Sequence, residues 1–205
     1  MDTKQVLRQK MLALRKAQMP ESVAAKSEAL FDRLKGLLPE GLTSVAMYAS
    51  LPSEVQTKNI YHCLKQRYPG APIYFPRVEA SSLKFYAVED WASLHTSSFG
   101  VLEPKGAPDS PQPAPERSLH IMPNISLDLL FVPGVAFSKK GQRLGFGKGH
   151  YDRALADLAQ KGARPRQIIG LAFEFQVLDS LPTEVTDHPI DIIITELNTY
   201  SIKSS

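Results

Sequence analysis

Four glycines within nine positions, residues 141–149, constrain the fold of this 205-residue chain more than any other feature. Glycine loses much backbone entropy on ordering and packs no side chain, so this run is expected to be neither a helix nor the interior of a strand. The residues from Tyr151 to Ala159 that follow have the pattern of a helix. The sequence therefore predicts a loop that leads directly into a helix N-terminus.

Two cations, Arg143 and Lys148, lie among these glycines. The N–H groups of such a loop and the positive end of the following helix bind anions, and the cations add full charges. The run predicts a phosphate-binding loop, with Asp152 in the first helical turn where a metal ion accompanying phosphates can bind. Lys148 is followed by glycine, which excludes a Walker loop, and the glycine spacing excludes the dinucleotide-binding fingerprint. A glycine-rich surface turn that binds nothing is the alternative interpretation.

Composition and charge narrow the class of protein. The chain has 43% hydrophobic residues, 22% charged residues and a net charge of +3, which is ordinary for a soluble protein, and we expect one domain over residues 1–205. Its basic residues are scattered, which favours an anionic small molecule over nucleic acid as partner. The single cysteine, Cys63, predicts neither disulfides nor a thiol zinc site. Neither a signal peptide nor a membrane span is evident, so we expect a cytoplasmic protein that does not bind membranes.

Helices and strands are expected to alternate along the chain. In the first helix, Leu7, Met11 and Leu14 recur at helical spacing, with Lys4, Arg8 and Arg15 on another face. Periodicity and breakers predict helices at residues 3–18, 21–38 and 57–68, and strands at residues 44–48, 72–75, 83–88, 127–132, 167–172 and 190–195. The proline-rich residues 104–123 are expected to form an extended loop. This order predicts a layered α/β fold.

Two further candidate groups each have a plain structural alternative. Glu54 follows a strand, where ligands of open α/β sheets collect, and its carboxylate can accept hydrogen bonds from ring nitrogens of a substrate. The alternative is an exposed loop glutamate. Lys4 and Arg8 lie one turn apart, so both can reach one phosphate. The alternative is a solvated helix face.

Asp187 precedes the apolar run at residues 190–195 and is a candidate magnesium ligand, because magnesium prefers oxygen ligands and few of them. The alternative is that it caps a turn. The five histidines show no spacing typical of a metal site. His150, between Gly149 and Tyr151, has no nucleophile context that would make it a triad base.

The segment from Leu127 to Phe137, together with residues 141–152, closely resembles the 5-formyltetrahydrofolate cyclo-ligase family, also called methenyltetrahydrofolate synthetases. Further segments of the family pattern follow the same order: the pair Lys4 and Arg8, residues 50–57, 99–104 and 172–176, and the stretch with Asp187 and Asp191. The chain departs from the family at Phe146, often Arg or Tyr, at His150, often Tyr or Phe, and at Ser138, often Asp.

The resemblance implies a fold and a set of site residues. The fold is a three-layer α/β/α domain with a mostly parallel central sheet, like that of sugar-phosphate isomerases and CoA-transferases. The implied ATP-binding residues are Lys4, Arg8, Arg143, Leu144, Gly145, Phe146, Gly147, Lys148, Gly149, His150 and Tyr151. The implied substrate-binding residues are Glu54, Phe146, Lys148 and His150. Lys148 and Arg143 would be catalytic, and Asp152 and Asp187 would hold Mg²⁺.

The implied reaction is the ATP- and magnesium-dependent conversion of 5-formyltetrahydrofolate, with or without a polyglutamate tail, to 5,10-methenyltetrahydrofolate. Such phosphoryl transfer needs positioning and charge neutralisation more than an enzymic nucleophile. The protein is expected to be a monomer or weak homodimer. A binding protein that has lost turnover and a sugar-phosphate isomerase-like enzyme are the competing hypotheses.

Overall fold

The computed structural model describes residues 3–79, 82–97, 100–105, 127–182, 184 and 187–202. The expected proline-rich loop at residues 104–123 lies almost entirely outside these ranges. Within them, no helix is long and apolar enough to cross a membrane.

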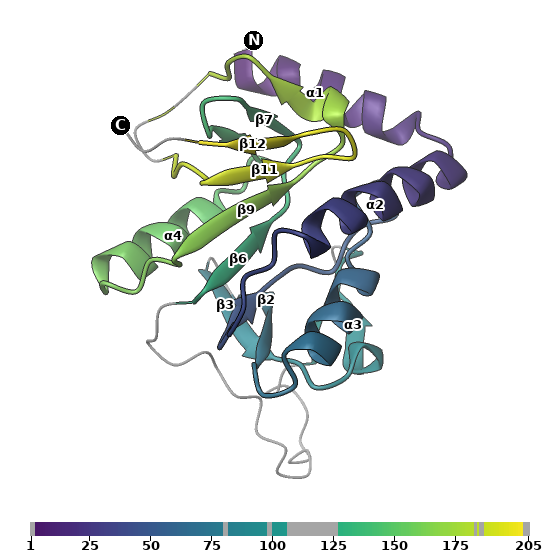
Figure 1. Ribbon diagram of the computed structural model, residues 1–205. Helices are drawn as coiled ribbons and strands as arrows, with labels where there is room; N and C mark the ends of the chain where they lie inside the picture. Colours follow the sequence, from purple (N-terminus) through teal and green to yellow (C-terminus); the bar gives the residue numbers. More distant parts are fainter. Residues whose placement is uncertain are drawn as a thin grey trace.

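A seven-stranded sheet forms the centre of the described structure (Figure 1). Its strands are β1 (Val45–Ala46), β2 (Ile73–Glu79), β3 (Ser82–Ala87), β6 (Leu129–Val132), β9 (Gln167–Leu171), β11 (Ile192–Ile194) and β12 (Thr199–Ser201). They run in the order β12-β11-β9-β6-β1-β2-β3. The five inner strands are parallel, and the two edge strands, β3 and β12, are antiparallel to their neighbours. The mostly parallel sheet implied by the family resemblance is confirmed, and so is the strand expected at residues 83–88, which lies at an edge of the sheet.

Helices cover both faces of this sheet (Figure 1). The four helices of the described residues are α1 (Thr3–Lys16), α2 (Pro20–Lys35), α3 (Lys58–Arg67) and α4 (His150–Gln160). Side chains of β6 alternate between two cores: Leu129 and Phe131 pack with α2 and α3, whereas Leu130 and Val132 pack with Leu155 of α4. This alternation is the period of two that a strand imposes, and it produces the three layers.

The sequence correctly predicted where most helices lie but not which face of the first helix is buried. Lys4, Met11 and Arg15 are the buried residues of α1, whereas Leu14 is 42% exposed. The predicted apolar face is therefore wrong at Leu14. The face of α1 that carries Lys4, Arg8 and Arg15 lies toward the rest of the protein. Carboxylates and backbone carbonyls of other segments accept hydrogen bonds from these side chains there.

Two small sheets were absent from the sequence prediction. One joins β7 (Ala136–Ser138), β8 (Arg143–Leu144) and β10 (Val177–Leu178), and the other pairs β4 (Leu94–Thr96) with β5 (Leu102–Pro104). Arg143 and Leu144 pair with β7, so these two residues of the glycine run form a strand. The prediction that the whole run is a loop is wrong there. Gly141 makes this pairing possible: its φ of 82° allows the tight return from β7 to β8.

The order of the strands creates a crevice between β1 and β6. After β1 the chain passes through α3 to β2, on one side of this pair; after β6 it passes through α4 to β9, on the other side. Neighbouring parallel strands whose connections diverge in this way leave an opening at their carboxyl ends, and ligands of α/β proteins bind there. Residues 47–57 and 133–135 follow these two strands and border that opening.

Candidate active site

A cavity of about 820 Å³ opens at this crevice. It is lined by residues from α1, from the segments after β1 and β6, from the glycine run and from the first turn of α4. All fourteen site residues predicted from the sequence line it: Lys4, Arg8, Glu54, Arg143, Leu144, Gly145, Phe146, Gly147, Lys148, Gly149, His150, Tyr151, Asp152 and Asp187. Residues up to 183 positions apart in the sequence thus meet around one space.

The glycine run forms the loop that the sequence predicts, from Gly145 to Gly149, and ends at the N-terminus of α4. Gly147 and Gly149 have positive φ values of 96° and 64°, which residues with a side chain rarely adopt. A Cβ at Gly149 would also lie 2.8 Å from Nη1 of Arg153. The loop conformation therefore depends on glycine, and it places the positive end of an eleven-residue helix at the cavity.

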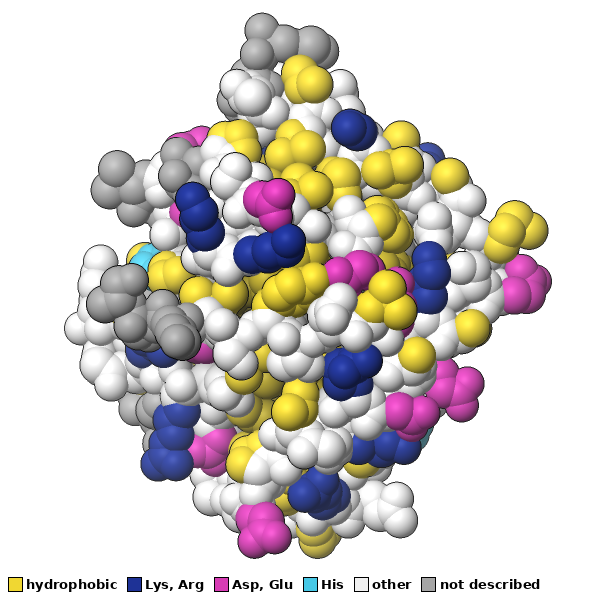
Figure 2. All heavy atoms as spheres, turned by 45° about the horizontal axis from the view of Figure 1, so that its top comes forward, with side chains coloured by type: hydrophobic (Ala, Val, Ile, Leu, Met, Phe, Trp, Pro, Cys, Tyr) yellow, Lys and Arg dark blue, Asp and Glu magenta, His cyan; other side chains and the backbone are white. Residues whose placement is uncertain are grey.

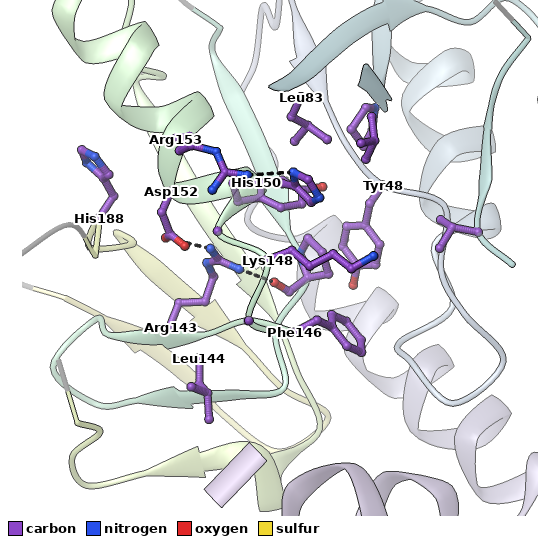
Figure 3. Close-up of a pocket in the computed structure, with 18 of the residues that line it drawn as sticks. Tyr48, Leu83, Arg143, Leu144, Phe146, Lys148, His150, Asp152, Arg153 and His188 are labelled. Carbon is purple, nitrogen blue, oxygen red and sulfur yellow. Dashed lines mark hydrogen bonds and ion pairs between the residues drawn. The ribbon is translucent and has the colours of Figure 1, made fainter. Parts of the chain in front are cut away.

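Arg143 lies under this loop and is almost fully buried. Its Nη2 donates to Oδ1 of Asp152 at 2.8 Å, its Nη1 donates to the carbonyl oxygen of Pro133 at 3.3 Å, and its guanidinium stacks 5.4 Å from the ring centre of Tyr151 (Figure 3). Its side chain is 4% exposed, whereas that of Asp152 is 22% exposed. The Arg143 guanidinium is therefore held in place by Pro133 and Asp152, and the Asp152 carboxylate remains partly exposed.

Helix α1 lies across the site and contacts two of its segments. Nζ of Lys4 lies 2.8 Å from Oδ2 of Asp187 and 3.1 Å from Oε1 of Glu184. Nε of Arg8, one turn later, donates to the carbonyl oxygen of Gly145 at 2.8 Å. The solvated helix face considered as an alternative is wrong for Lys4, which is 9% exposed. These contacts order the glycine loop and the segment before β11.

Asp187 caps a turn, which is one of the two functions that the sequence left open; its role as a magnesium ligand stays a prediction. Its Oδ2 accepts the backbone N–H of Glu184 at 2.8 Å, so it caps a turn, and it also lines the cavity. Burial acts to raise the pKa of Asp187, but the hydrogen bonds from Lys4 and Glu184 and the charge of Arg143 outweigh it, so the pKa lies below its ordinary value. The carboxylate is therefore ionised at neutral pH.

Asp152 and Asp187 fit a magnesium ion that arrives with phosphates. No group of three or more His, Cys, Asp or Glu side chains with metal-site geometry occurs in the described part of the chain. Magnesium is commonly held by one or two carboxylates and completes its shell with water and phosphate oxygens, so two aspartates at one cavity are an ordinary donor set for it. The site is thus suited to a magnesium–phosphate complex rather than to a stand-alone metal.

Glu54, in the segment after β1, also lines the cavity and is buried, at 6% exposure, so the exposed loop glutamate considered as an alternative is wrong. Its Oε2 accepts the backbone N–H of Leu51 at 2.9 Å, and its Oε1 lies 3.2 Å from Nη2 of Arg15. Burial raises the pKa of Glu54 and the charge of Arg15 opposes that rise; the pKa remains above its ordinary value. A buried carboxylate is thereby held in the wall of the cavity.

The cavity walls also contain apolar and aromatic residues that the sequence did not single out: Tyr48, Pro76, Val78, Leu83, Val101 and Leu102. Tyr48 lies two residues after β1, and its place at the end of the strand predicted at residues 44–48 is the sequence signal that could have indicated it. In Figure 3, Lys148 extends across the cavity toward Tyr48, and Leu144 points away from the other labelled side chains. Leu144 packs with Met11 in a separate cluster, so only its backbone can serve a ligand.

Comparison with known proteins identifies the family of this chain. A model of the 5-formyltetrahydrofolate cyclo-ligase family matches residues 1–196. The chain belongs to this family. The 5-formyltetrahydrofolate cyclo-ligase of Haemophilus influenzae is 30% identical over 191 residues, covering 92% of this chain and 91% of that protein.

Solved structures of cyclo-ligase relatives have the same fold. The 5,10-methenyltetrahydrofolate synthetase of Aquifex aeolicus superposes with a TM-score of 0.78 at 30% identity, covering 100% of this chain and 95% of that one. A 5,10-methenyltetrahydrofolate synthetase from Mycoplasma pneumoniae gives a TM-score of 0.70 at 24% identity over 95% of this chain and 99% of that one, which bears on the fold alone. The chain is therefore an enzyme with the three-layer fold of the cyclo-ligase family.

Proposed function

We propose that this enzyme converts 5-formyltetrahydrofolate to 5,10-methenyltetrahydrofolate at the cavity described above, with hydrolysis of ATP to ADP and phosphate. The observation that carries the proposal is that two chemically different groups of residues line one cavity. One group is the glycine loop with its cations and two aspartates, and the other is the buried carboxylate of Glu54 together with apolar residues. A triphosphate and a heterocycle can therefore meet in it.

ATP occupies the end with the glycine loop in this proposal. The N–H groups of the loop and the first turn of α4 face its phosphates, and Lys148 and Arg143 neutralise charge that develops on the transferred phosphoryl group. Lys4 and Arg8 add two cations from α1. Asp152 and Asp187 would hold Mg²⁺, which supplies charge neutralisation and fixes the orientation of the phosphates when bound.

The folate occupies the end with Glu54. A pterin ring offers N–H groups that a carboxylate can accept, and its flat faces suit the apolar walls at Tyr48, Leu83 and Leu102. Phe146, 46% exposed, lies in the glycine loop. The N5-formyl group would then lie beside Lys148, which Figure 3 shows crossing the cavity toward Tyr48.

The chemistry in this proposal needs no nucleophile from the protein. The formyl oxygen attacks the γ-phosphorus of ATP, the bond to ADP breaks, and an imidate phosphate of the folate forms. N10 then adds to the activated carbon and loses its proton, and phosphate leaves with the electrons of the C–O bond. The task of the protein is to align these groups and balance charge, which accounts for a site rich in cations and backbone donors.

One assay tests the proposal directly. Purified protein, 5-formyltetrahydrofolate and magnesium-ATP are mixed, and the absorbance of the methenyl product and the released phosphate are followed together. We expect one phosphate for each methenyl group formed. A binding protein without turnover would give neither signal, and phosphate release without the methenyl band would reject the folate as the acceptor.

A further inference from the structure

Arg15 is the most unusual residue of α1, because it is a charged side chain with only 2% exposure. A buried guanidinium is strongly unfavourable unless acceptors surround it. Arg15 lies two turns beyond Arg8 on the same helix face, yet it is not among the residues that line the cavity. It therefore lies behind the wall of the site rather than in it.

The acceptors of Arg15 come from both sides of the crevice between β1 and β6. Its Nη2 donates to Oγ of Ser53 at 3.1 Å and lies 3.2 Å from Oε1 of Glu54, both in the segment after β1. Its Nη1 donates to the carbonyl oxygen of Gly134, after β6, at 3.4 Å. One guanidinium thus joins the two segments that border the opening.

The same guanidinium also meets the glycine loop. Its Cζ lies 5.5 Å from the centre of the Phe146 ring, within range of a cation–π contact. Phe146 is exposed at the rim and Glu54 is buried in the wall, and both are predicted to contact the folate. Arg15 is therefore in contact with two of the four predicted substrate-binding residues, Glu54 and Phe146, at once.

We propose that Arg15 is a positioning residue, which holds the Glu54 carboxylate and the Phe146 ring in the arrangement that receives the substrate's heterocycle. The proposal rests on the proposed function, because it takes Glu54 and Phe146 as folate contacts. Arg15 acts from behind the wall and touches neither substrate. Its planar fork can serve Ser53, Glu54 and Gly134 together, which the single ammonium of a lysine cannot do in the same geometry.

Binding and kinetics separate this role from simple support of the fold. In Arg15→Met, we expect the KM and Kd for 5-formyltetrahydrofolate to rise about tenfold or more, the scale of losing one charge-assisted contact. The kcat and the Kd for magnesium-ATP should change by less than about threefold, because no ATP-binding residue contacts Arg15 except the rim residue Phe146. Arg15→Lys should recover part of the folate affinity. Lys16→Met, an exposed change on the same helix, is the control and should alter neither ligand.

A double variant keeps the test decisive if Arg15→Met folds poorly. Arg15→Met leaves Glu54 buried without its partner, whereas Arg15→Met with Glu54→Gln removes both charges and should melt closer to the parent protein. If Arg15 acts through Glu54, the double variant should bind folate about as weakly as Glu54→Gln alone, because effects of coupled residues do not add. Additive losses, or equal losses for folate and ATP, would overturn the positioning role.

The proposed function and the role of Arg15 are contradicted by different results. If Glu54→Gln binds folate as well as the parent does, the folate end assigned under the proposed function is wrong. If Glu54→Gln weakens folate binding but Arg15→Lys and the double variant show no coupling to it, the substrate assignment stands and the role of Arg15 is rejected.

Discussion

The glycine-loop end of the cavity comes mainly from one run of ten residues, 143–152, whereas the Glu54 end is assembled from segments far apart in the sequence. The apolar wall assigned to the Glu54 side combines residues after β1, residues of β2 and β3, and residues around β5. Figure 2, with the top of Figure 1 turned forward, shows Lys and Arg side chains near Asp and Glu side chains and exposed hydrophobic groups on the face turned to the viewer. An anion site formed by consecutive residues can be recognised in a sequence. An apolar wall formed by distant segments cannot, because only the fold shows which residues belong to it.

The two arginines beneath these ends differ in the same way. Arg143 and Asp152 are 2.8 Å apart with exposures of 4% and 22%, whereas Arg15 and Glu54 are 3.2 Å apart with exposures of 2% and 7%. A partly exposed carboxylate such as Asp152 can exchange its partner for a ligand, but an almost fully buried carboxylate such as Glu54 depends on the partner it has. The Arg143–Asp152 pair is therefore suited to a site where charge develops on a ligand, and the Arg15–Glu54 pair to holding one side-chain geometry.

Stability measurements give the largest expected contrast between these pairs. Arg15→Met should lower the free energy of unfolding by about 3–5 kcal/mol, because it leaves a buried carboxylate uncompensated. Arg143→Met should cost less, since water can reach Asp152. Urea unfolding of the two variants provides the comparison, and an equal loss would mean that the pairs do not differ in this respect.

Lys148→Met tests the catalytic side of the comparison. We expect kcat to fall by about two orders of magnitude or more, because one preorganised donor for the transition state is lost. The melting temperature should stay near that of the parent protein, since Lys148 is exposed. Lys140→Met, an exposed lysine at the turn before β8, is the matched control. Turnover within twofold of the parent would falsify the phosphate role of Lys148.

Glu54→Gln tests the opposite end. The change keeps the size of the side chain but removes its charge, so binding of 5-formyltetrahydrofolate should weaken by roughly 1.5–3 kcal/mol, the value of a hydrogen bond to a charged group. Magnesium-ATP should bind almost as before. Calorimetry with each ligand alone measures both. A loss of ATP affinity with unchanged folate affinity would show that the two ends are assigned the wrong way round.

Asp152→Asn and Asp187→Asn should each raise the magnesium concentration that supports half-maximal activity by about tenfold, or ~1.4 kcal/mol, because a neutral amide is a poorer ligand for a hard cation. Magnesium titrations at saturating ATP and folate measure this shift. Asp179→Asn, an exposed aspartate paired with Lys139, is the control. Unchanged titrations in both site variants would leave Asp152 and Asp187 as a helix-start residue and a turn residue.

Acid stability gives the smallest expected effect. The pKa of Asp187 is lower in the folded protein than in the unfolded chain, so its contribution is fully present above the unfolded pKa, near 4, and is lost as the pH falls through the folded value. The contribution should be below ~1 kcal/mol for a partly exposed pair. Urea unfolding between pH 6 and about 3 should show a shallower acid dependence for Asp187→Asn than for the parent. Identical slopes would mean that the Lys4–Asp187 pair adds nothing to stability.

Residue type and spacing are enough to predict the local features of this protein. Gly147 and Gly149 allow φ values that other residues avoid. The strands at 129–132 and 167–171 are readable as apolar runs, because strands of a parallel sheet are buried on both faces. These are short-range properties, which residue type and spacing encode. The resemblance of the glycine run to a known family extended them to a set of fourteen site residues, and the fold brings all of these residues to one cavity.

Which of several possible partners each polar residue meets depends on the fold. The sequence left a solvated position open for Lys4 and Glu54, and it put Arg15 on another face of its helix from Leu14, which periodicity placed inside. The fold buries the three charged side chains because Asp187, Ser53, Glu54 and the carbonyl of Gly134 gather beneath α1 and stabilise its cations there. Burial of a charge depends on acceptors contributed by distant segments, and their meeting is a property of the folded chain alone.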